Sequence, residues 1–280
     1  MGTVRIVTDS SCDLSITEAD QAGIIVVPLT IRFGDEEFVD RAELDPTTFY
    51  AKMAASDTLP ETAAPSPGAF EEAFRAMAAD GATSVLCINL SLGLSATGQS
   101  AQAAADAMAD ELDVRVIDSH SITCGLGSIV LRGADAAASG MAADDVEALV
   151  RDLGDRTHVF GVLDTLENLK KGGRVGGAKA LVGSMLSIKP LLDLSSGVVE
   201  EAGRQRTRKR ALQWLADKLG EYENVENVAV AHGDAPDHEA FLEMLSATVP
   251  RDQIRVGKIG PVIGTHGGPR VMGMSFTVID

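Results

Sequence analysis

The sequence predicts an α/β fold in two domains: an N-terminal α/β domain with a parallel sheet over residues 1–157, and a C-terminal mixed α/β domain over residues 158–280. Short apolar runs alternate with helical patterns through the first half, which is typical of parallel strands joined by helices. Near Arg156–His158 this alternation gives way to hairpin-like pairs of strands. The 280 residues suit two ordinary domains or one large one, and a hydrophobic content of 45% supports a substantial core.

The predicted strands of the first domain are short apolar runs, and the first of them closes in the polar turn Asp9-Ser10-Ser11. They cover Val4–Thr8, Ile24–Ile31, Val85–Ile88 and Val114–Ile117. The predicted helices cover Pro46–Ala55, Pro67–Ala79, Thr97–Ala109, Gly125–Ala138 and Ala143–Leu153. Pro67 favours a helix start at that point, because proline is well tolerated in the first helical turn.

The second domain has more hairpin content. Ile188–Leu194 and Gly197–Ala202 read as a hairpin, and the other predicted strands cover Val159–Leu163, Val228–His232, Ile254–Val256 and Val271–Val278. Helices are expected over Thr207–Gly220 and Asp237–Ala247. Apolar residues such as Met185, Leu186 and Leu191 read as ordinary core side chains.

Composition excludes several classes of protein. No apolar stretch reaches the roughly 18 residues of a membrane span, so we expect no stable membrane insertion. The start MGTVRIVTDSS lacks the regions of a signal peptide, which indicates a cytoplasmic protein. The cysteines Cys12, Cys87 and Cys124 form no CxxC pair, so neither a disulfide framework nor a zinc knuckle is indicated. Cys87 lies in an apolar run and reads as a core residue.

The net charge of −17 is unevenly placed. Residues 1–157 carry 9 basic and 26 acidic residues, whereas residues 158–280 carry 15 of each. Such an acid excess argues against nucleic acid as a partner, because duplex binding depends on neutralising phosphates.

The most informative motif is Leu90–Ala101, which reads LSLGLSATGQSA. It follows a predicted strand and leads into an Ala-rich helix. A turn of this kind presents hydroxyls and free backbone N–H groups at a helix N-terminus, where negative charge is favoured. The motif therefore predicts a cradle for a phosphate or a carboxylate.

Two further motifs carry polar side chains. Pro60–Gly68 (PETAAPSPG) reads as a stiff surface loop in which Ser66 caps the next helix and Thr62 is free to point into a site. Gly264–Gly268 (GTHGG) reads as a flexible loop that exposes His266 in a cleft, although a single loop histidine is often without function.

Two further segments are rich in basic residues. Gly172-Gly173-Arg174 follows Lys170 and Lys171 and places cations beside flexible backbone. Arg204–Arg210 (RQRTRKR) is expected to start a helix, where positive charge is opposed by about 0.3–1 kcal/mol per charge. This segment indicates either an anionic partner or a solvated basic surface.

Known enzyme motifs are incomplete. The Gly93–Thr97 turn resembles G-x-S-x-G but lacks the final glycine, so a Ser95–His266 hydrolase remains an alternative without an evident acid. There is no P-loop, and GGRVGG is not a dinucleotide fingerprint. His232-Gly233-Asp234 could ligate a metal but has no further ligands at usable spacing.

Taken together, seven motifs in order resemble those of the DegV family, which includes the fatty-acid-binding subunits of bacterial fatty acid kinase. They are VTDSSCDLS, PETAAPSP, LSLGLSATGQSA, VIDSHSITCGLG, LENLKKGGRVGG, SIKPLL and GTHGGPRVMG, and they extend from Val4 to Ile279. The resemblance implies two α/β domains that hold one long-chain fatty acid in a tunnel between them.

The resemblance also implies the roles of individual residues. The carboxylate would meet Thr62, Ser95, the backbone N–H of Ala96, and His266. A separate ATP-binding kinase subunit would convert it to an acyl phosphate, with Arg174 and Arg206 on the docking or phosphate side. The chain itself would be non-catalytic, with the fatty acid as its ligand and no cofactor or metal.

Three alanines depart from the family pattern. Ala63 and Ala64 replace polar side chains that the family often has, and Ala96 replaces a glycine. Alanine at position 96 is disfavoured if the turn requires a positive φ. Acyl chain length and saturation, oligomeric state and the kinase partner stay open. So does a third possibility by analogy of fold, a transfer enzyme with a covalent histidine, similar to dihydroxyacetone-kinase-type proteins.

Overall fold

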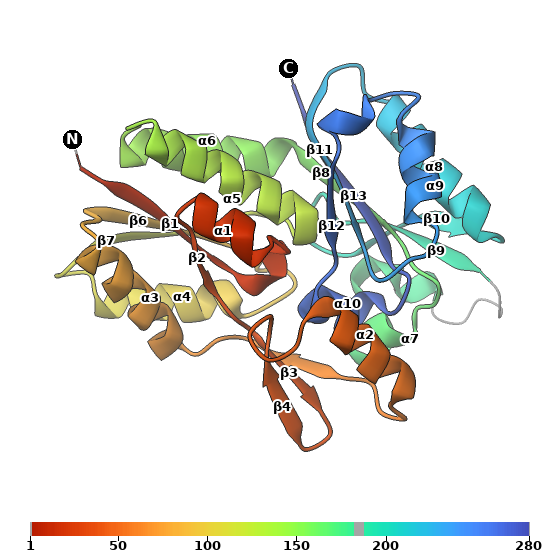
Figure 1. Cartoon of the computed structure of the whole chain (residues 1–280), viewed down its shortest axis with the longest axis horizontal. Helices are drawn as coiled ribbons and strands as arrows, with labels where there is room; N and C mark the ends of the chain where they lie inside the picture. Colours follow the sequence, from red (N-terminus) through yellow and green to blue (C-terminus); the bar gives the residue numbers. More distant parts are fainter. Residues whose placement is uncertain (1, 182–187, 280) are drawn as a thin grey trace.

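The computed structural model describes residues 2–181 and 188–279, and its first sheet is entirely parallel (Figure 1). The strand order is β2-β1-β6-β7. The strands are β1 (Val4–Asp9), β2 (Ile25–Val27), β6 (Ser84–Asn89) and β7 (Asp113–Asp118). Because helices cover both faces, the strands are apolar on both sides, as expected for a parallel sheet.

The helices of this sheet form two layers. On one face, α3 (Pro67–Ala79) and α4 (Thr97–Ala107) bury Phe70, Phe74 and Met108 against Val7 and Val85. On the other face lie α5 (Thr123–Ala138) and α6 (Ala143–Arg156). The predicted parallel sheet with helices on both faces is confirmed.

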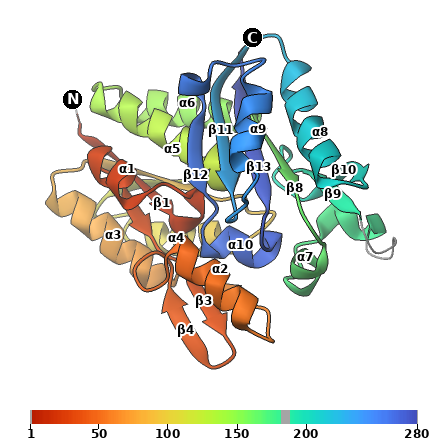
Figure 2. The same cartoon turned by 45° about the vertical axis from the view of Figure 1, so that its right-hand side comes forward.

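The second sheet is mixed, as predicted, with the order β10-β9-β8-β13-β11-β12. Its strands are β8 (Thr157–Val162), β9 (Lys189–Asp193), β10 (Glu200–Gln205), β11 (Val225–His232), β12 (Arg255–Lys258) and β13 (Met272–Val278). The pair β11–β12 is parallel, and the other pairs are antiparallel, including the predicted hairpin of β9 and β10. Helices α8 (Arg208–Gly220) and α9 (His238–Leu245) cover its outer face (Figure 2).

Helix α5 lies between the two sheets and belongs to both (Figure 1). A Cβ atom at Gly125 would lie 2.7 Å from Cγ2 of Val159, so the absence of a side chain allows α5 to approach β8 closely. All strands of the first sheet precede residue 157, and β8 begins at Thr157. One hydrophobic cluster nevertheless joins α5 to β8 and β11, and the division into two domains at residue 157 stays a prediction.

A small antiparallel sheet in the order β4-β3-β5 projects from the first sheet together with α2. Its core contains Phe33, Phe49 and Val262, which joins it to α10. The elements are β3 (Thr30–Phe33), β4 (Glu36–Val39), β5 (Glu61–Ala63), α2 (Pro46–Ala55) and α10 (Pro261–Gly267). The remaining short elements are α1 (Ile16–Gln21), α7 (Glu167–Lys171) and the 3₁₀ turns η1 (Ser10–Cys12), η2 (Gly176–Leu181) and η3 (Arg251–Gln253).

The small sheet corrects two sequence predictions. The single strand expected over 24–31 is two strands, because Pro28 lies between them and the chain leaves the first sheet there. The Pro60–Gly68 segment is not wholly a loop, since Glu61–Ala63 forms β5 and pairs with β3. The predicted helix cap at Ser66 is confirmed, because its side chain accepts from the Ala69 N–H group.

Two basic or glycine-rich segments also differ from expectation. Gly264–Gly268 is not a loop, because its residues through Gly267 form the end of α10. Arg204 does not start a helix: it lies in β10, and α8 begins at Arg208 after the Thr207 cap. Leu191 and Cys87 are buried, as predicted, whereas Met185 and Leu186 lie outside the described residues.

Candidate functional site

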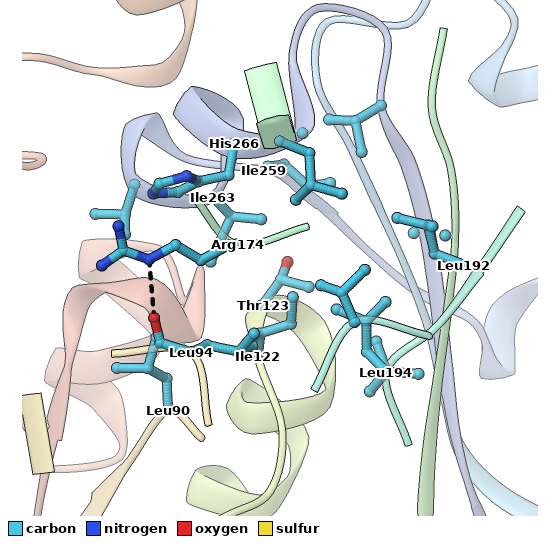
Figure 3. Close-up of a pocket in the computed structure, with 18 of the residues that line it drawn as sticks. Leu90, Leu94, Ile122, Thr123, Arg174, Leu192, Leu194, Ile259, Ile263 and His266 are labelled. Carbon is cyan, nitrogen blue, oxygen red and sulfur yellow. Dashed lines mark hydrogen bonds between the residues drawn. The ribbon is translucent and has the colours of Figure 1, made fainter. Parts of the chain in front are cut away.

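An apolar pocket of about 830 Å³, its open mouth included, lies between α10, the β6–α4 turn, the start of α5 and the strands β8, β9 and β13. Apolar side chains form most of the wall, among them Leu90, Ile122, Val159, Leu192, Ile259 and Val262. Figure 3 shows Arg174 and His266 together at one end and Leu192 and Leu194 at the other.

Two glycines form a bare part of the wall. Gly161 of β8 and Gly273 of β13 are direct partners across the sheet, and both line the pocket. A Cβ atom at Gly161 would lie 4.0 Å from Leu194 Cδ1, and one at Gly273 would lie 3.8 Å from Ile259 Cδ1. Leu194 and Ile259 also line the pocket. A side chain at Gly161 or Gly273 would therefore extend into the pocket. An isolated glycine within each predicted strand is a sequence signal that could have indicated this close approach of a ligand to the backbone.

Polar side chains gather at the mouth. Thr62 comes from β5 and His266 from the last turn of α10, and Thr62 Oγ1 lies 3.0 Å from His266 Nε2. Pro261 starts α10, and Gly268 ends it with a φ of 76°, which glycine adopts without strain. The pairing of β5 with β3 and the packing of α10 against α7 place these side chains at the same wall.

His266 is neutral at physiological pH. Burial and the nearby charge of Arg174 lower the pKa of the imidazole to about 4. Within the described parts of the chain, Nδ1 has no hydrogen-bond partner. A Cβ atom at Gly172 would lie 2.2 Å from this nitrogen, so glycine is required there for close approach. The site therefore offers an uncharged imidazole to a ligand.

Ser95 lies in the β6–α4 turn and lines the same pocket. Its hydroxyl is 2.9 Å from Thr97 Oγ1 and accepts a bond of 3.3 Å from the Thr97 N–H group. Ala96 caps α4 without a side-chain hydrogen bond, and its φ is −79°, a conformation that alanine accepts. Ala96 is exposed and does not line the pocket.

Arg174 joins the segment after α7 to this turn. Its Nε donates to the Leu94 carbonyl at 3.1 Å, and its Nη1 donates to the Gly172 carbonyl at 2.7 Å. Arg174, Thr62 and His266 also border an outer groove that continues to Lys171 and the Asp57–Glu61 segment. The pocket therefore opens at its polar end.

The structure brings together Thr62, Ser95, His266 and Arg174, but it places Arg206 elsewhere. Arg206 is exposed in the turn between β10 and α8 and does not line the pocket. Its neighbour Arg208 pairs with Asp237 at 3.0 Å and with Asp164 at 3.5 Å. Thr123, which sequence reasoning missed, is a fifth polar residue in the pocket wall.

The arrangement is not that of a serine hydrolase. Nε2 of His266 faces Thr62, and the hydroxyl of Ser95 faces Thr97. Among the residues that the structure describes, no carboxylate pairs with Nδ1 to orient the ring. His232 stacks on His238 and accepts a hydrogen bond from the Ala235 N–H group. Over residues 2–181 and 188–279, no group of three or more His, Cys, Asp or Glu side chains could hold a metal ion. None of the helices in these ranges is long and apolar enough to cross a bilayer.

The depressed pKa of His266 predicts a pH dependence of stability. The unfolded imidazole titrates near 6.5 and the folded one near 4, so the unfolded state binds more protons between these values. We expect the contribution of His266 to the free energy of unfolding of the lipid-free protein to fall by up to about 3 kcal/mol as the pH drops through this window. Urea titrations from pH 4 to 8 measure it.

The control for this prediction is His266→Gln, which removes the titrating group. Burial raises the pKa of Asp40 to about 7, which gives a stability change of the opposite sign, so the difference between the two proteins is the informative quantity. Parallel pH profiles of wild type and variant would contradict the assignment.

Residues 3–278 match the model of a family described as "Uncharacterised protein, DegV family". A DegV domain-containing protein of Streptomyces coelicolor is 34% identical over 97% of both chains. One of Listeria monocytogenes is 32% identical over 98% of both chains.

Two solved structures are similar to this chain over its whole length. A DegV family protein from Thermus thermophilus, described by its fatty acid binding, has a TM-score of 0.90 at 32% identity, with 100% of both chains covered. DegV of Bacillus subtilis, described as a fatty acid binding protein, has a TM-score of 0.87 at 28% identity, also with complete coverage of both chains.

Proposed function

The chain belongs to the DegV family, and from this membership we propose that it binds one long-chain fatty acid and presents the carboxylate to a separate ATP-dependent kinase subunit. The observation that carries the proposal is the distribution of polarity in the pocket. Thr62, His266 and Arg174 line both the pocket and its outer groove, and apolar side chains line most of the rest. Ser95 lines the pocket next to Leu94, whose carbonyl accepts from Arg174. The fatty acid binding described for the relatives from Thermus thermophilus and Bacillus subtilis supports it.

Burial of the acyl chain against the apolar wall supplies most of the free energy of binding. An acyl chain of about 16 carbons gains roughly 12 kcal/mol at about 0.8 kcal/mol per buried CH₂. Ordering of the chain and loss of its free motion reduce this value substantially. The remainder is sufficient for a fatty acid to stay bound through purification.

The polar end holds a carboxylate without cleaving anything. The Ser95 hydroxyl can donate a hydrogen bond to an anion, and so can whichever of Thr62 and the neutral His266 does not give its proton to the bond between them. The first N–H groups of α4, which begins after Ala96, favour negative charge. Arg174 adds a positive charge next to His266. The chain acts here as a non-catalytic carrier that needs no cofactor.

The outer groove supplies a route for phosphoryl transfer. A carboxylate oxygen at His266 would attack the γ-phosphorus of ATP held by the kinase subunit, with ADP leaving and an acyl phosphate remaining on this chain. Lys171 and Arg174 border the groove, and the exposed Arg206 is a candidate docking residue. Such a transfer places the protein in the cytoplasm, where ATP is available.

The proposal predicts that purified protein contains one fatty acid per chain. Mass spectrometry of the organic extract of denatured protein would identify it, and native mass spectrometry would show its loss on delipidation. Freshly purified protein without lipid that also fails to take up added palmitic or stearic acid would contradict the proposed function.

A further inference from the structure

Thr123 is an unexplained polar residue inside the apolar part of the pocket. It is the first residue of α5, the whole residue is 2% exposed, and it lines the pocket beside Ile122 and Val159. Its hydroxyl makes no hydrogen bond to any residue that the structure describes. Buried hydroxyls without a partner are uncommon in native proteins and call for an explanation.

The position of Thr123 suits contact with the middle of a bound chain. Figure 3 shows it between the end that holds Arg174 and His266 and the end that holds Leu192 and Leu194, with its hydroxyl oxygen directed into the space between the side chains. Thr123 is therefore separate from the polar groups at the mouth.

The backbone at Thr123 is strained. Its φ is 45°, a left-handed conformation that is a genuine outlier for a β-branched residue. Residues held in such conformations cluster at ligand sites, where the surrounding structure imposes them. Here the carbonyl of the preceding Ile122 accepts from the N–H groups of Gly125 and Leu126, which fixes the start of the helix.

A second unsatisfied group lies behind Thr123. Burial raises the pKa of the Asp13 carboxyl, while the charge of Arg41 and weak hydrogen bonding from the Thr123 hydroxyl act in the opposite direction, so the hydroxyl is close to Asp13. The contact lacks the geometry of a normal hydrogen bond, and Asp13 Oδ2 has no other partner among the described residues, so Asp13 competes with a ligand for this hydroxyl. Rotation about the Cα–Cβ bond moves the hydroxyl between staggered positions, so it can turn toward either Asp13 or the pocket.

We propose that Thr123 is a second polar contact for the ligand, and that the pocket takes fatty acids that carry a hydroxyl group along the chain. The inference rests on the proposed fatty acid binding and specifies its substrate class. A ligand hydroxyl both donates and accepts, so it can pair with Thr123 whichever way the threonine hydroxyl is oriented. An unsubstituted chain offers Thr123 no such partner and leaves its hydroxyl beside Asp13.

The test uses the delipidated full chain with stearic acid and a set of stearic acids that carry one hydroxyl at successive positions. We expect one isomer to bind about three- to tenfold more tightly than stearic acid, as expected for one net hydrogen bond. Thr123→Val, which keeps the β-branched shape, should lose this preference and still bind stearic acid. Thr123→Ser should keep it.

Controls separate the outcomes. Ser128→Ala removes a buried hydroxyl from the same helix, one that donates to the Cys124 carbonyl and does not line the pocket, and it should leave the preference unchanged. If Thr123→Val melts at a much lower temperature than wild type, Thr123→Ala replaces it. No preferred isomer, or a preference that survives loss of the hydroxyl, overturns the proposal and leaves an ordered water as the partner of Thr123. Failure to bind stearic acid as well would instead contradict the proposed function.

Discussion

Replacing Gly161 by leucine is expected to weaken binding of palmitic or stearic acid by about 100-fold. The new side chain would enter the pocket beside Leu194, at the end remote from His266. Displacing only four methylene groups from the wall loses about 3 kcal/mol at about 0.8 kcal/mol each, which corresponds to roughly two orders of magnitude in affinity. Isothermal titration of delipidated protein with each acid measures the effect.

Fatty acids of different length provide a control for this substitution. A shorter acid such as octanoic acid does not fill the far end, so its weaker binding should be nearly unchanged in Gly161→Leu. Gly273→Ala is a matched variant, because its Cβ would lie 3.7–3.9 Å from its nearest neighbours, which is ordinary contact. It should retain both the fold and most of the affinity. Equal binding of stearic acid by wild type and Gly161→Leu would show that the chain does not pass between β8 and α10.

Local signals predicted the helices well because their ends are encoded locally. Helices α2 and α3 have the predicted bounds, since Asp45 and Ser66 cap them and a proline follows each cap. The capping box of α1, formed by Ser15 and Glu18, was equally readable and was missed.

Structure that depends on distant partners was not predictable in the same way. Strand β5 forms because Glu61–Ala63 pairs with β3, about thirty residues earlier in the chain. Helix α10 forms in a segment rich in glycine, because packing of Val262 against Phe49 and the other residues of the small sheet outweighs its low helix propensity. For the same reason its histidine was expected in a loop and instead lies in the last turn of a helix, where it is half-buried and lines the pocket.

The candidate site was predictable in part. The hydroxyl-rich Leu90–Ala101 turn indicated an anion site, and the family resemblance assigned Thr62, Ser95 and His266 to one carboxylate. All three line the same pocket, and their shared role stays a prediction. The apolar pocket was not predictable, because side chains that line it have the same pattern as core residues. Thr123 gave no signal, since its importance comes from a missing partner in three dimensions.

The second large effect is expected when residues that contact the fatty acid carboxylate are replaced. Ser95→Ala and His266→Ala should each lower the rate of acyl-phosphate formation about 10- to 100-fold, because each removes a hydrogen bond to a charged group, worth about 1.5–3 kcal/mol. The rate is measured with an added ATP-binding kinase subunit, ATP and saturating fatty acid, with the acyl phosphate trapped by hydroxylamine. Saturation ensures that a loss of rate reports the orientation of the carboxylate rather than its occupancy.

Three variants make this result specific. Ser100→Ala, on the same helix as the Ser95 turn but outside the pocket wall, should leave the rate unchanged. His266→Gln keeps a donor near the position of Nε2 and should recover part of the rate. Arg206→Ala should raise the kinase concentration needed for half-maximal rate without changing fatty acid affinity, because Arg206 is exposed outside the pocket. Unchanged rates in both Ser95→Ala and His266→Ala would remove the carboxylate from this end of the pocket, and a changed fatty acid affinity in Arg206→Ala would remove that residue from the docking surface.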